Sequence, residues 1–385
     1  MAENNIDAIV PDIYEALDVV SRELTGLIPA VTLSASAERA RVGQEIIVDI
    51  ASTVTGVDIT PAMVAPDPAG LTSEGTPIII TKERAFPFGF NGNDQKGLNT
   101  GPGYLNNRQG KIAQAIRAAV NEVETDLGGL QSTFSGAYGT AGTTPFGTAS
   151  DYTDASNVLR MLKDRGGNVD PQLVLDTVAG ANFIGKQSAV NSAGTDSMLR
   201  QGVLLDLVGM PLRESAQIRQ AVTAGTGASA TTDAAGYAVG ATTITLASAG
   251  TGTIIAGDLI AITGDATGKY RVVTGDTNVA DGGTVVIAAP GLMQAIPAGA
   301  TAITVSAAST RNMCFARSAL VLATRAPALP EEGDLAVDRM MITDPRSGLS
   351  LEFSMYKGYR KVRYEVAIAW GVKNIKPEHT ALLLG

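Results

Sequence analysis

Side chains that commonly act as nucleophiles or general bases are scarce in this chain. His379 is the single histidine and follows Pro377 near the end of the sequence, a position that does not suit a Ser-His-Asp constellation. One histidine also cannot supply a zinc motif that needs two. Cys314, the single cysteine, would need the same distant histidine as its base. We therefore interpret Cys314 as a buried structural cysteine.

Residues 264–269, GDATGK, have some of the composition of a phosphate-binding loop. Only three residues separate the two glycines, and Tyr270 stands where the motif needs a magnesium-binding Ser or Thr. We therefore predict a turn between two strands here.

Asp276, Asn278 and Asp281 have a partial resemblance in spacing to a calcium-binding loop. Ala280 interrupts the pattern, and no glutamate follows at the required distance. The 38 acidic residues also offer many carboxylate pairs, which without geometry do not indicate a glycosidase. We predict no catalytic, cofactor-binding or metal-binding residue, and the poor chemical inventory favours a structural protein over an enzyme.

The composition is that of a globular protein with more than one core. The chain has 385 residues, of which 45% are hydrophobic and 17% charged, so two or three domains are expected. The net charge is −9 and we find no basic run, which disfavours tight binding of nucleic acid. The lone cysteine makes no internal disulfide. The N-terminus lacks the apolar region of a signal peptide, and no apolar stretch of about twenty residues occurs. We expect a soluble protein made in the cytoplasm.

The clearest strand pattern lies at the end of the chain, in residues 348–385. Apolar side chains alternate with polar ones from Leu349 to Met355 and again from Val362 to Trp370. This alternation predicts an antiparallel hairpin with its turn at Lys357 and Gly358, which Pro377 ends. We expect the hairpin to close a sheet begun much earlier; a plain edge hairpin is the alternative.

The N-terminal part predicts an arm followed by a long hairpin. Residues 11–33 place Ile13, Leu17, Val20, Leu24 and Ile28 on one helical face, and Gly26 and Pro29 end the helix. From residue 42 to 90 the pattern changes to strands at 45–50 and 77–81, with an irregular stretch between them. This predicts a projecting hairpin, or alternatively a surface loop between two strands.

Residues 106–127 predict the clearest helix, about 33 Å long. Gly128 and Gly129 follow as its stop signal. The expected buried stripe comprises Ile112, Ile116, Ala119, Val120, Val123 and Leu127, and the expected polar face comprises Gln114, Arg117, Asn121 and Glu124.

Two further regions follow this helix. Residues 131–221 predict a loop, a helix at 151–165, a strand from 173 and a strand, turn and strand at 202–212, together an α/β layer. Residues 222–310 are rich in Gly, Ala and Thr and poor in charge, and we interpret them as a small antiparallel barrel or sandwich inserted into that layer. Its expected strands are 242–246, 259–263, 270–273, 284–287 and 302–305, and residues 316–327 are expected to return to the layer as a strand.

Five stretches of this sequence carry a family resemblance. They are PDIYEALDVVSRELTGLIPAV (11–31), GQEIIVDI (43–50), LVGMPLRESAQI (207–218), AGDLIAITG (256–264) and VAIAWGVKNIKPEHTALLLG (366–385). Together with the order of the predicted parts, they resemble the HK97-like major capsid proteins of tailed double-stranded DNA phages, in the podophage-type branch with an inserted β domain. Trp370-Gly371-Val372 and Lys376-Pro377-Glu378 stand where that branch has an aromatic-Gly-Val and a Lys/Arg-Pro-Glu.

The resemblance implies an α+β HK97-like capsid fold. Its expected parts are an N-terminal arm (1–36), an E-loop hairpin (37–90), a P-domain with the spine helix (91–130), an A-domain (131–221), the inserted β domain (222–310) and return strands of the A- and P-domains (311–385).

The resemblance also implies a function. Such a subunit self-assembles as hexamers and pentamers into an icosahedral shell in the host cytoplasm, encloses DNA without sequence-specific binding, and becomes part of the virion. The implied partners are a separate scaffolding protein, a portal and, in some members, a decoration protein; no membrane is implied. The alternatives are an encapsulin-like cellular nanocompartment shell, which the inserted domain disfavours, and a β-rich adhesion or glycan-binding protein.

Overall fold

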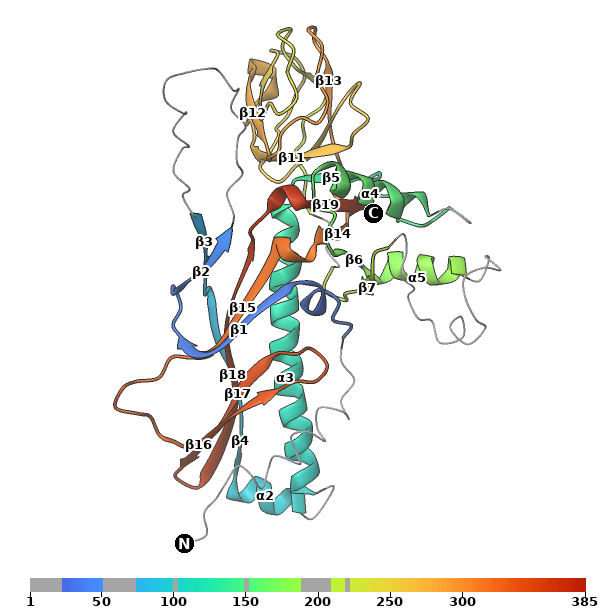
Figure 1. The fold of residues 1–385 in the computed structure, drawn as a ribbon. Coiled ribbons are helices and arrows are strands. Elements are labelled where there is room, and N and C mark those ends of the chain that lie inside the picture. Colours follow the sequence, from blue (N-terminus) through green and yellow to red (C-terminus); the bar gives the residue numbers. More distant parts are fainter. Residues whose placement is uncertain (1–22, 51–73, 100–102, 149–151, 188–208, 219–221) are drawn as a thin grey trace, which may run out of the picture.

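The computed structural model is an elongated α+β molecule (Figure 1). It describes residues 23–50, 74–99, 103–148, 152–187, 209–218 and 222–385. One long helix, α3, runs along a six-stranded sheet, and an eleven-stranded sheet lies at the C-terminal end of that helix (Figure 1).

Helix α3 spans Tyr104–Gly129, so the expected helix is confirmed and is a few residues longer at its start. All six residues of the predicted apolar stripe are buried. At 26 residues the helix is about 39 Å long. One member of the predicted polar face is different: Glu124 is 0% exposed. Glu124 is buried because other segments of the chain cover it, which the helical period alone does not show.

The six-stranded sheet is organised around β18 (Lys361–Asn374). One edge of β18 pairs with β17 (Ser350–Gly358) and, further along, with β15 (Leu320–Pro327). Its other edge pairs with β4 (Lys82–Asn91). The antiparallel hairpin of β17 and β18 is confirmed, and the edge-hairpin alternative is wrong because β18 has partners on both sides.

The turn of this hairpin lies two residues later than predicted. Gly358 pairs with Lys361, so the turn residues are Tyr359 and Arg360. Arg360 has a φ of 56°, the left-handed conformation of a tight hairpin turn. Lys357 and Gly358 belong to β17.

The outer strands of this sheet were not expected from the sequence. β16 (Ala336–Thr343) pairs with β17, and β1 (Thr32–Ala40) pairs in parallel with β15. Much of β16 and β1 faces solvent, so neither shows a clean apolar alternation.

The N-terminal helix expected over residues 11–33 is wrong in its described part, and residues 11–22 lie outside the described residues. Residues 23–27 are not helical; only a 3-10 turn at Ile28–Ala30 occurs, and Leu24 is 52% exposed. The backbone amides of Gly26, Leu27 and Ile28 donate to the Glu124 carboxylate. These donors are therefore satisfied by a side chain of α3 and not by a helix.

The expected long hairpin is confirmed at its base, where β2 (Glu45–Ile50) pairs with β3 (Glu74–Ile79). Its predicted irregular tip lies outside the described residues. Beyond β3 the chain crosses β18 so closely that a Cβ on Gly371 would lie 2.0 Å from the carbonyl oxygen of Ile79. Glycine is therefore required at this crossing.

The eleven-stranded sheet contains the expected α/β layer. Helix α4 (Thr153–Asp164) is confirmed, and β6 (Pro171–Leu175) leads into α5 (Thr177–Gln187). The strand, turn and strand expected at 202–212 falls largely outside the described residues. The strand expected at 316–327 is confirmed as β15 (Leu320–Pro327), which starts four residues later than predicted. A 3-10 turn separates it from β14 (Arg311–Ala316), which was not predicted.

The chain ends in a strand that the sequence analysis missed. β19 (Thr380–Leu384) pairs with β14 and β5, and all five of its residues are buried. A fully buried strand has no polar alternation, and five residues are too few to distinguish it from an apolar tail.

The five strands expected in residues 222–310 are all present within a residue or two of the expected bounds. A separate cluster of buried side chains from this region lies between them. The strands do not form a sheet of their own, because β11 pairs with β5 and so joins them to the larger sheet.

The remaining short elements are α2 (Gly92–Asn99), β5 (Gly136–Tyr138), β7 (Leu212–Glu214), β8 (Ala230–Thr231), β9 (Thr243–Leu246), β10 (Leu259–Ile262), β11 (Lys269–Thr274), β12 (Gly283–Ile287), β13 (Ala302–Val305) and 3-10 turns at Leu130–Thr133, Val279–Asp281, Arg317–Ala319 and Pro377–His379.

The burial of α3 gives a direct test of its phase. Ile116→Asp places an unpaired carboxylate in the core and should lower the free energy of unfolding by several kcal/mol. Ala118→Asp, two positions along on the exposed face, should change it by about 0.5 kcal/mol or less. Urea denaturation measures both, and equal losses would contradict the assigned orientation of the helix.

Candidate functional site

The two reactive side chains singled out in the sequence are placed in the same sheet region but offer no catalytic arrangement. Cys314 lies on β14 with 0% exposure, and burial raises the pKa of its thiol to about 12. Its Sγ lies 3.8 Å from Sδ of Met210. A neutral, enclosed thiol of this kind is structural. His379 lies in the 3-10 turn that precedes β19.

The two loops with partial binding motifs are held by their own contacts. Residues 264–269 form the predicted turn between β10 and β11, where Asp265 accepts hydrogen bonds from Thr267 and Tyr270. In the other loop, the amide side chain of Asn278 donates to Asp281. Over the described ranges, no group of three His, Cys, Asp or Glu side chains is arranged to hold a metal ion. None of the helices in those ranges is long and apolar enough to cross a membrane.

The densest polar arrangement lies instead on one stretch of the long helix, residues 117–126 of α3. Side chains of this stretch bind the N-terminal segment at residues 23–28, the start of β4 at 82–84 just after the long hairpin, the segment 215–217 and Trp370 of β18. We call this stretch and its partners the joint. It connects parts of the chain that are far apart in sequence.

Glu124 is the centre of the joint. Its Oε1 accepts from the amides of Gly26 and Leu27, both at 2.7 Å, and its Oε2 accepts from the amide of Ile28 at 3.0 Å. The Ser215 hydroxyl donates to Oε1 at 2.8 Å. Burial raises the pKa of this carboxyl, and the four hydrogen bonds oppose that rise. A single side chain thus fixes the N-terminal segment and residue 215 to the helix.

A second carboxylate, Glu23, holds the beginning of the described N-terminal segment. It forms a two-pronged ion pair with Arg117 and accepts from the Asn121 amide. The hydrogen bond from Arg117 is the main reason that the pKa of Glu23 falls from 4.5 to about 2. A depressed carboxyl pKa means that this contribution to stability is complete at neutral pH and is lost as the pH falls from about 4.5 toward 2.

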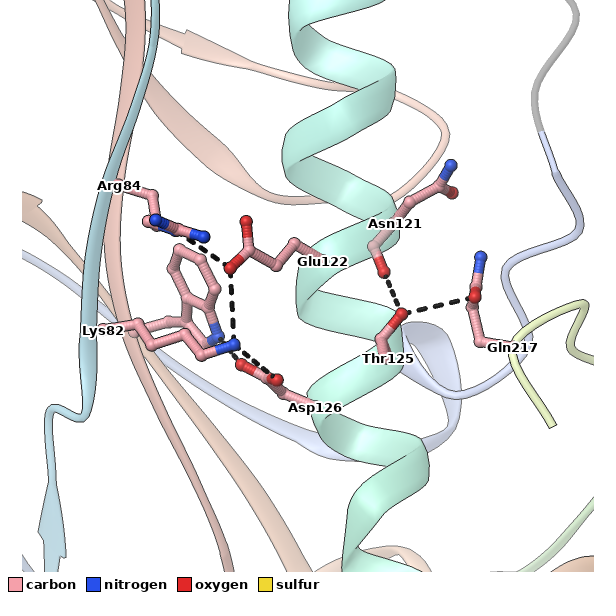
Figure 2. Close-up of polar contacts among 8 residues, drawn as sticks. Lys82, Arg84, Asn121, Glu122, Thr125, Asp126 and Gln217 are labelled. Atoms are coloured by element: carbon pink, nitrogen blue, oxygen red, sulfur yellow. Dashed lines mark hydrogen bonds and ion pairs between the residues drawn. The ribbon is translucent and has the colours of Figure 1, made fainter. Parts of the chain in front are cut away.

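The start of β4, just after the long hairpin, is attached on the other side of the helix (Figure 2). Lys82 donates to Asp126 at 2.8 Å and to Glu122 at 3.3 Å, and Arg84 donates to Glu122 at 3.0 Å. The indole of Trp370 donates to Asp126 at 2.9 Å. The hydrogen bond to Asp126 is the largest cause of the raised pKa of Lys82. These contacts fix the start of β4 and Trp370 of β18 to the long helix.

The segment that enters the eleven-stranded sheet completes the joint. Thr125 bridges Gln217 and the carbonyl of Asn121, with oxygen–oxygen distances of 3.3 and 2.8 Å (Figure 2). The joint therefore binds the N-terminal segment, the start of β4 and the segment that follows β7 of the eleven-stranded sheet, all through a few turns of one helix. The role of this arrangement is mechanical. It holds residues 23–28, 82–84 and 215–217 in fixed positions relative to one another.

Surfaces beyond the joint carry exposed apolar side chains. On the two-stranded sheet of β2 and β3, Ile47 is 69% and Ile79 45% exposed. Elsewhere Leu335 is 85% and Tyr359 90% exposed. The joint and these surfaces were missed in the sequence because an acidic residue on a helix, or an isoleucine in a strand, does not reveal which segment covers it. The one available signal was the spacing of Glu124, which lies four residues after Val120 and three before Leu127, two members of the predicted apolar stripe.

The buried position of Glu124 makes a prediction. Glu124→Gln puts an NH₂ group against one of the four present donors, and an unpaired buried donor costs about 1–3 kcal/mol of unfolding free energy. Glu122→Gln is the matched control on the same helix, and its partly exposed ion pairs should cost about 1 kcal/mol or less. Urea denaturation at pH 7 compares the two. A loss for Glu122→Gln as large as that for Glu124→Gln would contradict the central place of Glu124.

Comparison with known proteins finds similar folds and no close relative. No protein-family model and no curated protein matches the chain. Among solved structures, the mature capsid of bacteriophage PhiM1 is similar with a TM-score of 0.46 and 12% identity, covering 95% of this chain and 89% of that one. The capsid of the Myoviridae phage XM1 has a TM-score of 0.46 and 9% identity, covering 96% and 95%. A chain of Mycobacterium phage Che8 has a TM-score of 0.43 and 13% identity, covering 94% and 92%. These alignments cover 94–96% of this chain at 9–13% identity.

Proposed function

We propose that this chain is the HK97-like major capsid protein of a tailed double-stranded DNA phage, the subunit of an icosahedral shell. The observation that carries this proposal is the joint, which holds three parts that project from one long helix. An arrangement of this kind suits a subunit whose work is done through contacts with other copies.

The hairpin of β2 and β3 supports the proposal most directly. It is a two-stranded sheet with one covered face, because Ile78 is 0% exposed and packs with Val321 and Ala369 of the six-stranded sheet. Its exposed Ile47 and Ile79 would remain in water in a lone subunit. A neighbouring copy that accepts the open face of this hairpin removes the cost of that exposure, as expected of an E-loop.

The family-like motifs also occupy places where they support the proposed architecture. Trp370 and Gly371 lie at the joint, where the indole binds Asp126 and the glycine allows the hairpin base to cross β18. Lys376, Pro377 and Glu378 form the turn that sends the chain from β18 into β19, and so from one sheet to the other.

The proposed subunit belongs to the virion and assembles as hexamers and pentamers with a separate scaffolding protein and a portal; a decoration protein is a further candidate partner. Its net charge of −9 suits a container for DNA, because a strongly basic lining would hold the phosphates and hinder packing and release.

The finer proposal is that residues 222–310 are an inserted β domain of the podophage-type branch, with the remaining boundaries as given by the resemblance. Two observations support it. Val222 and Ser309 form an antiparallel bridge, with the amide of Val222 donating to Ser309 at 3.1 Å, so the two ends lie together. The strands between them enclose their own buried cluster, which includes Ile260, Val272 and Val285.

Assembly is the first test. The purified chain, co-expressed with its scaffolding protein, should sediment as closed shells of megadalton mass, and negative-stain images should show icosahedral particles. DNA in mature particles would favour the phage capsid, and packaged protein cargo would favour a cellular nanocompartment. A chain that stays monomeric under all these conditions would contradict the proposal.

Removal of the proposed insertion is the second test. A short Gly-Ser linker between Gln220 and Arg311 should leave the helices folded, because the two ends already lie together, while impairing stability or control of shell size. Circular dichroism at 222 nm and analytical ultracentrifugation measure these effects. Loss of the helical circular dichroism signal would show that residues 222–310 are part of the main core and that the proposed boundary is wrong.

A further inference from the structure

The tip of the hairpin formed by β17 and β18 carries a dense group of basic residues. Lys357, Arg360, Lys361 and Arg363 fall within seven positions, and all four are exposed. Tyr359 lies among them and is 90% exposed. We call residues 357–363 the basic tip. It is a local exception to the absence of a basic run inferred from the sequence, and it lies on a chain whose net charge is −9.

Most of this positive charge has no counterpart in the subunit. Arg363 pairs with Glu365 at 2.7 Å. The side chains of Lys357, Arg360 and Lys361 make no ion pair or hydrogen bond within the part of the chain that the structure describes. Three cations are therefore available to a partner.

A group of acidic residues lies in the loop between β15 and β16, which extends away from the sheet (Figure 1). We call residues 330–335 the acidic loop. Glu331 and Glu332 are exposed and have no ion pair among the described residues, and Leu335 is 85% exposed. The base of the loop is fixed, because Asp334 pairs with Arg339 and accepts from the Tyr356 hydroxyl at 3.2 Å.

The two charged groups lie at the same end of the six-stranded sheet. Ala336, which follows the acidic loop, pairs with Tyr356, which precedes the basic tip. Despite this closeness no ion pair joins the two groups within the subunit. On the paired ends of β4 and β18, beside the basic tip, lies an open pocket lined by Phe88, Phe90 and Val362, with Lys361, Arg363 and one acidic residue, Asp94, also in its lining.

We infer that the basic tip of one copy binds the acidic loop of a second copy. Glu331 and Glu332 of one subunit face Arg360 and Lys361 of the next, and Leu335 enters the pocket beside the basic tip. The contact joins two different groups of the subunit, so copies can repeat it around a rotation axis and close into a ring. The inference rests on the proposed function, since it describes one contact of the proposed shell.

Charge favours a second copy over nucleic acid as the partner. Three free cations are few for a phosphate backbone, and the neighbouring Glu331 and Glu332 would repel it. A second copy instead offers two carboxylates and an apolar side chain that fit the cations and the pocket. Exposed ion pairs contribute little affinity individually, so this contact mainly sets which surfaces meet, and it should weaken in high salt.

Charge reversal and restoration in the full-length chain test the contact. Arg360→Glu with Lys361→Glu should lower the yield of assembled protein at least tenfold, and so should Glu331→Lys with Glu332→Lys. The four substitutions together should restore most of the yield, because the pairs re-form with opposite sign. Leu335→Ser alone should lower the yield less. Lys111→Glu with Lys163→Glu, on exposed faces of α3 and α4, controls for net charge.

Sedimentation of oligomers of every size separates this inference from the proposed function. Wild-type shells together with unchanged assembly of both reversed variants would overturn the contact and leave the capsid proposal standing. Small salt-sensitive oligomers that are lost and restored as above, without shells, would support the contact and overturn the capsid proposal. A wild-type monomer under all conditions would overturn both. A mobility shift with a 30-base-pair duplex that disappears on reversal of the tip, with assembly unchanged, would assign the tip to nucleic acid instead.

Discussion

The buried carboxylate of Glu124 is the interaction on which the rest of this structure depends. A carboxylate removed from water is costly unless its oxygens are fully hydrogen-bonded, and here four donors satisfy it. Three of the donors are backbone amides of residues 26–28, and the fourth is Ser215. Because this one charge must be satisfied, the N-terminal segment and the residue that follows β7 of the eleven-stranded sheet meet the long helix at a single place.

The same region of the helix also holds the start of β4, the strand that follows the long hairpin. Lys82 and Arg84 bind its acidic side chains, and Gly371 allows the chain to cross β18 in close contact. The exposed face of the hairpin, with Ile47 and Ile79, is thus held at a defined position while its other face packs on the six-stranded sheet. In the proposed shell a rigid joint presents these incomplete surfaces to neighbouring copies, and assembly completes them.

The sequence predicted those elements whose burial follows a regular period. The stripe from Ile112 to Leu127 predicted α3, because the helix buries one face. The alternation from Val362 predicted β18, although residues 366–371 of that strand are buried on both faces. It did not predict β19, which is buried on both faces, or β1, which is largely exposed, since neither shows a period. The joint was not predictable because it depends on which distant amides reach Glu124, and helical spacing placed that residue on the polar face.

The central claim is that the subunit is rigid at the joint and incomplete at the hairpin. Hydrogen exchange measured by mass spectrometry, on the same chain before and after assembly, tests both halves together. The account predicts slow exchange for residues 24–30 in both states, and for the hairpin residues 45–50 and 74–79 slow exchange only after assembly. Rapid exchange of residues 24–30 in the free subunit, or a hairpin already fully protected there, would contradict it.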